Sequence, residues 1–239
     1  MEFNEFLEEF KDLAKKSGLE IKEVKIKKFY DYMLLIKEWN EKINLTAITN
    51  PKEMIIKHFI DSLTIANQIG ENSKIIDVGT GAGFPGIPLK IYNDSIRITL
   101  LDSLNKRTVF LKEVVNKLNL QNVEIIHGRA EDFAQKSNYR EQYNVAVSRA
   151  VAPLNILLEY LVPYVKVGGN AIAMKGSNAV EEINESKNAL KELNSDIKEY
   201  KKMYLPDENG ERFIIMVEKH KNTPKIYPRK AGIPKKKPL

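Results

Sequence analysis

The sequence predicts an α/β fold in which a mostly parallel sheet follows a helical N-terminal segment and ends in an antiparallel hairpin. Two observations predict it. From Lys74 onward, short apolar runs alternate with stretches of helical spacing, which is typical of a parallel sheet with helices on both faces. The last two apolar runs are separated only by turn residues, which indicates a pair of antiparallel strands.

The N-terminal segment is expected to form helices. Apolar residues recur at three- and four-residue spacing from Phe3 to Ala14 and again from Ile21 to Trp39, as on one face of a helix. Asn50-Pro51 predicts a further start, because asparagine caps helices and proline suits the first helical position. Gly70 predicts the end of that helix. Residues 1–70 are therefore expected to form a helical cap.

Residues 71–218 are expected to form one domain around the sheet. The predicted parallel strands are Lys74–Val78, Arg97–Leu101, Val123–His127, Tyr143–Ser148 and Asn170–Met174. The predicted helices are Ile87–Tyr92, Lys106–Leu118, Pro153–Tyr164 and Ala179–Leu193. The hairpin joins Ile197–Leu205 to Glu211–Glu218 through a Pro206–Gly210 turn. A parallel sheet finished by such a hairpin is the Rossmann-like arrangement of class I methyltransferases, which at this point is an analogy of fold alone.

Composition excludes several kinds of chemistry. The chain has 239 residues, 43% hydrophobic and 29% charged, with three histidines and no cysteine. It therefore has no disulfide, no cysteine-ligated zinc and no cysteine nucleophile, and we expect no metal site. The apolar runs fall short of the roughly 18 residues of a membrane helix. The N-terminus opens with acidic residues rather than a basic leader, so the expected location is the cytoplasm.

The positive charge is concentrated in residues 219–239. This tail holds eight Lys or Arg and no acid, whereas residues 1–218 carry 30 basic and 32 acidic residues. Such a segment is a candidate contact for a polyanion, or a solvated end that only aids solubility. Its regular prolines predict an extended or turning chain rather than a helix.

The strongest local motif is the segment Asp77-Val78-Gly79-Thr80-Gly81-Ala82-Gly83-Phe84-Pro85-Gly86, directly after the first strand. Glycine permits positive φ and lets a ligand rest against the backbone, at the sheet edge where open α/β sheets bind ligands. A dinucleotide loop, G-x-G-x-x-G, would need glycine where Phe84 stands. The G-x-G-x-G spacing after an acid favours S-adenosylmethionine instead.

Two further segments complete the predicted cofactor site. Asp102 ends the second strand, where an acid can accept hydrogen bonds from ribose hydroxyls. Gly128–Asp132 follows the third strand and can reach an adenine edge. Each glycine could equally serve an ordinary turn and each acid an N-cap, but three such features at strand ends predict a cofactor.

Absences narrow the methyl acceptor. Known pyrimidine-carbon methylation needs a cysteine. Enzymes that methylate exocyclic base amines commonly carry an Asn/Asp-Pro-Pro-aromatic motif after the fourth strand, where this chain has Ser148–Pro153. Enzymes that methylate the ribose 2′-hydroxyl often use a Lys-Asp-Lys-Glu set, and this chain has no Asp after the fourth strand. A nucleophilic ring nitrogen such as guanine N7 remains. It needs no general base, and positioning can supply roughly 7–11 kcal/mol.

Arg149 is the best candidate for a charged residue that takes part in binding or in the reaction. It ends an apolar strand and could bind the cofactor, a phosphate or guanine O6, or it could form a structural ion pair with Glu131 or Asp102. Lys175, at the end of the next strand, is a weaker candidate for an RNA phosphate. His58 and His127 are expected to be structural.

The chain resembles the small-subunit ribosomal RNA methyltransferase G family, also called glucose-inhibited division protein B, over nearly its whole length. The likeness rests on the glycine segment, on Ser148-Arg149-Ala150 and on three more segments, namely Trp39–Thr46, Lys57–Leu63 and Tyr227–Leu239. It implies methylation of a guanine N7 in the decoding-region loop of 16S ribosomal RNA. It also implies cofactor contacts at Gly79, Phe84, Ala130, Glu131 and Arg149.

Together these arguments predict the following residues. The cofactor-binding residues are Gly79, Gly81, Phe84, Asp102, Ala130, Glu131 and Arg149. The RNA-binding residues are Lys175, Arg229, Lys230, Lys235, Lys236 and Lys237. No catalytic acid or base is assigned. The expected partner is 16S ribosomal RNA or the small ribosomal subunit, and the absence of a sustained heptad predicts a monomer.

Three alternatives stay open at the level of the sequence. One is a nicotinamide-dependent dehydrogenase on the same kind of sheet. Another is a methyltransferase that acts on a protein or a small molecule. The last is an RNA-binding module whose cleft is vestigial.

Overall fold

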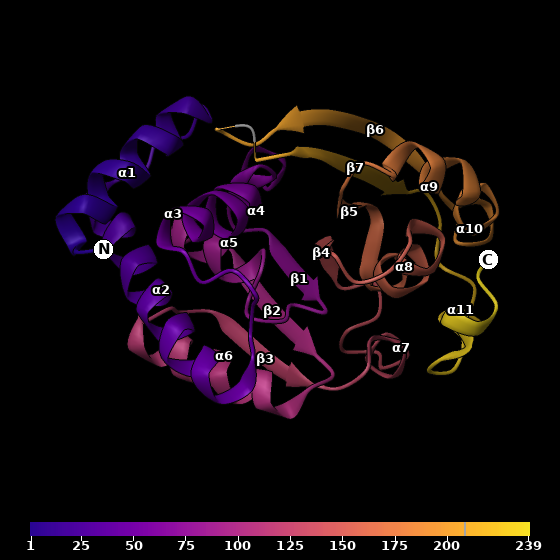
Figure 1. Ribbon diagram of the computed structural model, residues 1–239. Coiled ribbons are helices and arrows are strands. Elements are labelled where there is room, and N and C mark those ends of the chain that lie inside the picture. The colour runs from indigo at the N-terminus through magenta and orange to yellow at the C-terminus, as the bar shows by residue number, and fades with distance from the viewer. Residues whose placement is uncertain (208) are drawn as a thin grey trace.

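A single sheet forms the centre of the molecule. The computed structural model describes residues 1–207 and 209–239, and within them seven strands lie in the order β3-β2-β1-β4-β5-β7-β6 (Figure 1). The strands are β1 Lys74–Val78, β2 Arg97–Asp102, β3 Val123–His127, β4 Tyr143–Arg149, β5 Val165–Lys175, β6 Ser195–Tyr204 and β7 Glu211–Lys219. β1 to β5 pair in parallel, and β7 pairs antiparallel with both β5 and β6. The predicted α/β class and hairpin are confirmed.

The predicted strands agree with the observed ones to within two residues at each end, except at the start of β5. This strand begins at Val165, five residues before the predicted start, because Val165 pairs with Tyr143 before an irregularity in the register. Gly168, at φ 77°, lies in the first five residues of β5, where the sequence shows no strand-like apolar pattern. In the predicted Pro206–Gly210 turn, Leu205 N–H donates to Gly210 O at 3.0 Å, and residue 208 lies outside the described residues.

Helices cover both faces of the sheet because alternate strand residues point to opposite faces. Ile75 belongs to one apolar core and Ile76 to the other, and Ile214 and Ile215 divide in the same way. The helices within the sheet region are α5 Gly86–Tyr92, α6 Asn105–Lys117, α7 Ala130–Phe133, α8 Leu154–Leu161, η3 Val162–Tyr164, α9 Ala179–Glu185 and α10 Lys187–Glu192. The predicted helix Ala179–Leu193 is thus two helices, and they meet at buried Ser186, whose hydroxyl donates to Ile183 O.

The N-terminal helices share an apolar core with one face of the sheet. They are α1 Phe3–Lys16, α2 Glu23–Ile43, α3 Pro51–Met54, η1 Ile55–Ile60, α4 Asp61–Leu63 and η2 Ala66–Gln68. Asn50 caps α3 as predicted, accepting a hydrogen bond from Glu53 N–H. The helix that follows is a π-helix in η1, and its last α-helical residue is Leu63 rather than one next to Gly70.

The C-terminal tail packs against the sheet domain. Arg140 donates from Nη1 to Tyr227 O and from Nη2 to Thr223 O, both at 2.8 Å, and Tyr227 is buried. The expectation that the tail lacks helix is wrong for α11 Ile233–Lys236. Pro234 stands in the first turn of this helix, where a missing N–H costs nothing. Figure 1 shows α11 beside α7 and α8.

Candidate active site

The glycine loop after β1 forms the floor of the site. Gly81 N–H donates to Asp102 Oδ2 at 2.8 Å, and its φ of 63° suits glycine. A Cβ at Gly81 would meet nothing within 4 Å, so the backbone there faces open space. At Gly79 (φ 73°) a Cβ would lie 2.6 Å from Val151 Cγ2. A side chain at Gly79 would therefore strike the protein itself, whereas one at Gly81 would enter the cavity.

Asp77 holds the loop from below. Its Oδ2 accepts hydrogen bonds from Thr80 Oγ1 at 2.6 Å and from Gly86 N–H at 2.8 Å. The side chain is fully buried, and Oδ1 has no partner among the residues described. Burial raises the pKa of Asp77 to about 7, because a low-dielectric environment disfavours the ionised carboxyl.

Asp102 stands where β2 ends, at the edge of the cavity. Its Oδ2 accepts from Gly81 N–H, its Oδ1 accepts from Leu104 N–H at 2.8 Å, and Arg107 Nη1 lies 3.4 Å from Oδ2. A carboxylate offers about four acceptor sites. It therefore keeps acceptor capacity for hydroxyl groups of a ligand.

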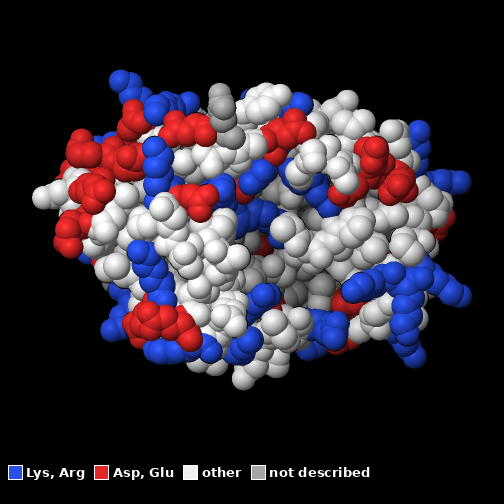
Figure 2. Space-filling model, viewed as in Figure 1, with Lys and Arg blue, Asp and Glu red and all other residues white. Residues whose placement is uncertain are grey.

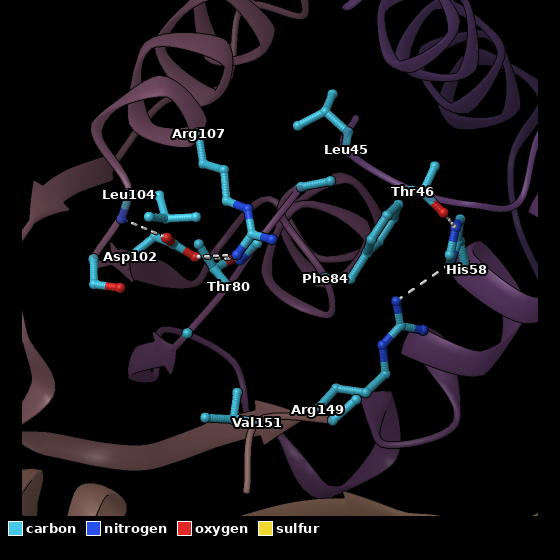
Figure 3. Close-up of a pocket in the computed structure, with 15 residues that line it drawn as sticks. Leu45, Thr46, His58, Thr80, Phe84, Asp102, Leu104, Arg107, Arg149 and Val151 are labelled. Carbon is cyan, nitrogen blue, oxygen red and sulfur yellow. Dashed lines mark hydrogen bonds and ion pairs between the residues drawn. The ribbon is translucent and has the colours of Figure 1, made fainter. Parts of the chain in front are cut away.

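Two adjoining cavities lie over this loop. The larger, of about 480 Å³, is bordered by the glycine loop, Leu45, Thr46, His58 and Arg149 (Figure 3). The smaller, of about 150 Å³, is bordered by Gly128–Glu131 and Tyr160. Both include Gly79, Asp102, Ser103 and Val151 in their walls. A long ligand could therefore lie across the ends of β1 and β2 with one end in each cavity.

Arg149 enters the larger cavity from the end of β4. Its Nη1 donates to Lys57 O at 3.0 Å and to Asp61 Oδ2 at 2.9 Å, and its guanidinium lies 4.9 Å from the centre of the Phe84 ring. The sequence left open a structural ion pair of Arg149 with Glu131 or Asp102. Arg149 does form a structural ion pair, but its partner is Asp61, so the expected partners are wrong. Asp61 lies in the Lys57–Leu63 segment on which the family likeness rests, but the sequence analysis gave it no role.

His58 completes this wall of the cavity. Its ring stacks on Phe84 with centroids 4.4 Å apart and planes 21° apart, and Nε2 lies 2.8 Å from Thr46 Oγ1. Burial, and then the charge of Arg149, lower the pKa of His58 to about 3. The imidazole is therefore neutral near pH 7 and shapes the wall (Figure 3).

A comparison with known families identifies the chain. The family model for rRNA small subunit methyltransferase G (GidB) matches residues 25–209. The chain belongs to this family. Ribosomal RNA small subunit methyltransferase G of Clostridium perfringens (strain SM101 / Type A) is 51% identical over 234 residues, 95% of this chain and 98% of that relative. The protein of the same name from Thermoanaerobacter sp. (strain X514) is 50% identical over 95% of each chain.

Solved structures agree with this fold. A predicted O-methyltransferase, Atu636 from Agrobacterium tumefaciens, superposes with a TM-score of 0.54 at 15% identity, over 68% of this chain and 82% of that one. M. jannaschii TYW2 in complex with AdoMet gives 0.53 at 16% identity, over 66% and 72%. Identity this low shows the fold alone. Family membership makes this methyltransferase G an S-adenosylmethionine-dependent enzyme, so the dehydrogenase alternative is wrong.

The residues that line the two cavities fit S-adenosylmethionine. The open backbone at Gly81 leaves room for the ligand, and Asp102 keeps acceptor capacity at the edge shared by the two cavities. Ala130 and Glu131 border the smaller cavity, as the sequence predicts for an adenine edge. Glu131 Oε1 also accepts a hydrogen bond from Gly232 N–H at 3.1 Å. The tail therefore reaches a predicted cofactor residue, which the sequence did not indicate.

The predicted RNA-binding residues divide into two groups. Lys175 is buried, bonds to Ala152 O and pairs with Glu182 at 2.6 Å. Arg229 pairs with Glu159, whose side chain has no exposed surface. Both cations therefore have protein partners in the positions where RNA phosphates were expected.

The other four predicted RNA contacts, Lys230, Lys235, Lys236 and Lys237, are exposed. Figure 2 shows Lys and Arg side chains gathered where Figure 1 places α11. His127 is exposed at the end of β3 and lies 3.2 Å from Ser103 O.

Within residues 1–207 and 209–239, no cluster of three or more His, Asp or Glu side chains could hold a metal ion. None of the helices in this part of the chain is long and apolar enough to cross a membrane.

Proposed function

We propose that this protein transfers the methyl group of S-adenosylmethionine to N7 of a guanine in 16S ribosomal RNA, at the guanosine-527-type position. The substrate is the RNA of the small ribosomal subunit, and the enzyme acts as a monomer. Its relatives of about 50% identity carry the name of a small-subunit ribosomal RNA methyltransferase.

The observation that carries the choice of acceptor is the lack of a free general base in the described wall of the cofactor cavity. His58 has a pKa of about 3 and bonds to Thr46. Asp102 bonds to two backbone N–H groups. Beyond Arg149, Asp61 is paired with Arg149 and Arg212, and Glu182 is paired with Lys175. An acceptor that must lose a proton before attack would therefore lack a free base among these residues. Guanine N7 carries a lone pair that is ready to react.

Bound S-adenosylmethionine supplies an electrophilic methyl group. The chain's contribution is position. The predicted cofactor residues Gly79, Gly81, Phe84, Asp102, Ala130, Glu131 and Arg149 line the two cavities. Phe84 and His58 form a stacked, water-excluding wall, and Arg149 is fixed by Asp61 and Lys57 O. Fixed geometry of this kind lowers the barrier of a two-reactant step.

Charge on the tail supports RNA as the acceptor. Lys230 and Lys235–Lys237 are exposed and belong to the tail that carries the positive excess of the chain. A splayed loop nucleotide is the form of folded RNA in which N7 is accessible, because the deep major groove of an A-form helix hides it.

The direct test is methyl transfer to small subunits prepared from cells that lack this protein. Labelled S-adenosylmethionine is added with the purified enzyme, and N7-methylguanine is mapped along 16S RNA by strand cleavage at the modified base. We expect one new site in 16S RNA. Label in protein or in small molecules, or at another base, would refute the proposal, and an Arg149→Ala variant is the matched control.

A further inference from the structure

A third cavity adjoins the cofactor cavity on the side away from Asp102. It has a volume of about 620 Å³ and shares His58, Arg149, Ala150 and Val151 with the cofactor cavity. These shared residues form the boundary between the two cavities. The third cavity, called here the acceptor cavity, is therefore placed to hold the methyl acceptor.

One buried carboxylate ties two arginines of this cavity together. Asp61 is 2% exposed. Its Oδ2 lies 2.9 Å from Arg149 Nη1, and its Oδ1 lies 3.0 Å from Arg212 Nε. Arg149 ends β4 and borders both cavities, whereas Arg212, in β7, borders the acceptor cavity but not the cofactor cavity.

The cluster leaves an uncompensated positive charge. Arg149 alone would neutralise Asp61, so the second arginine brings the cluster to one net positive charge. Other cations around the cavity have their own partners: Lys57 pairs with Glu53, and Lys175 pairs with Glu182, each at 2.6 Å. Excess charge in a partly buried place is costly without a counter-ion, so the cavity favours an anionic ligand.

Arg212 keeps donors for such a ligand. Among its described contacts, Nε bonds to Asp61 Oδ1 and Nη1 bonds to Glu211 O at 3.0 Å. An arginine has five N–H groups arranged to match a phosphate. Figure 2 shows Lys and Arg side chains in and around the hollow at the centre of this face.

We infer that Arg212 binds a phosphate of the target nucleotide in the acceptor cavity, and that Asp61 is a positioning residue. Asp61 holds this phosphate-binding arginine at a fixed distance from Arg149 on the cofactor side. The inference rests on the proposed function. It gives a role to Asp61, a residue of the Lys57–Leu63 segment on which the family likeness rests.

The π-helix supplies the local reason for this arrangement. A π-helical turn has i→i+5 bonds and is common at functional sites. In η1 the Lys57 carbonyl accepts from Arg149 Nη1, and His58 of η1 and Asp61, the first residue of α4, both reach the same guanidinium. The wide turn thus presents two groups to Arg149, and Asp61, directly after it, contacts both Arg149 and Arg212.

The test compares Arg212→Gln and Arg212→Lys with Lys201→Gln, which removes one charge from an exposed residue of the same hairpin. Cofactor Kd is measured by calorimetry, and kcat and KM for 16S RNA are measured over a salt series. For Arg212→Gln we expect an RNA KM at least tenfold higher, a cofactor Kd within twofold of wild type, and a log–log salt slope smaller by about 0.7. Arg212→Lys should recover part of the affinity and the whole slope, and Lys201→Gln should change neither.

Asp61→Asn separates positioning from simple contact. Because Asp61 holds both arginines, this variant should weaken cofactor and RNA together and lower kcat, while Arg212→Gln affects RNA alone. Unchanged RNA KM and slope in Arg212→Gln, or equal losses for both ligands, would overturn the inference. If the wild-type enzyme itself fails to modify 16S RNA, the proposed function fails instead.

Discussion

Replacing Arg229 with methionine is expected to lower the free energy of unfolding by about 3–5 kcal/mol, the usual cost of leaving a buried charge without its partner. Glu159 has no exposed surface. The Glu159 carboxylate accepts one hydrogen bond from the backbone N–H of Arg229 at 2.7 Å. It accepts two more from the Arg229 side chain, from Nε at 2.9 Å and from Nη2 at 2.6 Å. The substitution leaves only the backbone bond.

Urea unfolding followed by circular dichroism measures this effect. With an m-value of about 3 kcal/mol/M, the urea midpoint should fall by about 1–1.7 M. Lys230→Met is the matched control, because Lys230 is the next residue, is exposed and should change stability by less than about 0.5 kcal/mol. Adding Glu159→Leu to Arg229→Met should restore most of the loss, since apolar residues can replace a buried ion pair.

The opposite result would support the role that the sequence predicted for Arg229. If Arg229→Met unfolds at the wild-type midpoint but binds 16S RNA more weakly, then the arginine serves RNA, and the ion pair with Glu159 contributes little.

Three further predictions concern the cofactor loop and the tail. Gly81→Leu should raise the cofactor Kd by calorimetry more than tenfold, because its side chain enters the open space over the loop; an unchanged Kd would remove the loop from the cofactor site. Lys235→Gln, Lys236→Gln and Lys237→Gln combined should reduce the RNA salt slope by up to about 2, at 0.7 for each phosphate contact; an unchanged slope would make these lysines bystanders. Asp77 has a folded pKa of about 7, above its unfolded value, so the native state binds the extra proton and stability should fall as pH rises from about 4 to 7. Asp77→Asn should flatten that fall in urea titrations at several pH values, and an unchanged pH profile would contradict the buried carboxyl as its cause.

Periodicity predicted the sheet well because each strand shows its own short apolar run. The exceptions have local physical causes. β5 starts early because Val165 pairs with Tyr143, and the register is irregular between this pair and Asn170. Gly168 and Gly169 lie in that stretch, and glycine carries no periodic signal. The helix after Asn50 changes to a π-helix, and its residues IIKHFI show no pattern that separates this turn from an α-helix.

Cofactor candidates came from strand ends, and the structure brings most of them to one edge of the sheet. Individual charges were harder to assign because a sequence gives no partner for them. Glu159 interrupts an apolar run, which indicates a buried acid, but its partner lies 70 residues later in the tail. Lys175 ends a strand, which is a position typical of a phosphate-binding residue, yet it pairs with Glu182 of the next helix, α9.

In the acceptor cavity, strand direction brings together charged residues that spacing along the sequence does not connect. Parallel strands bring their carboxyl ends to one edge, so Arg149 at the end of β4 is an expected member of the site. β7 runs the other way, so its first residues lie at this same edge: Met174 of β5 pairs with Arg149 on one side and with Ile214 on the other. Arg212, two residues before Ile214, is thereby brought to Asp61, 151 positions away in sequence. The closing hairpin therefore adds a cation to the acceptor side that a wholly parallel sheet would place at the opposite edge.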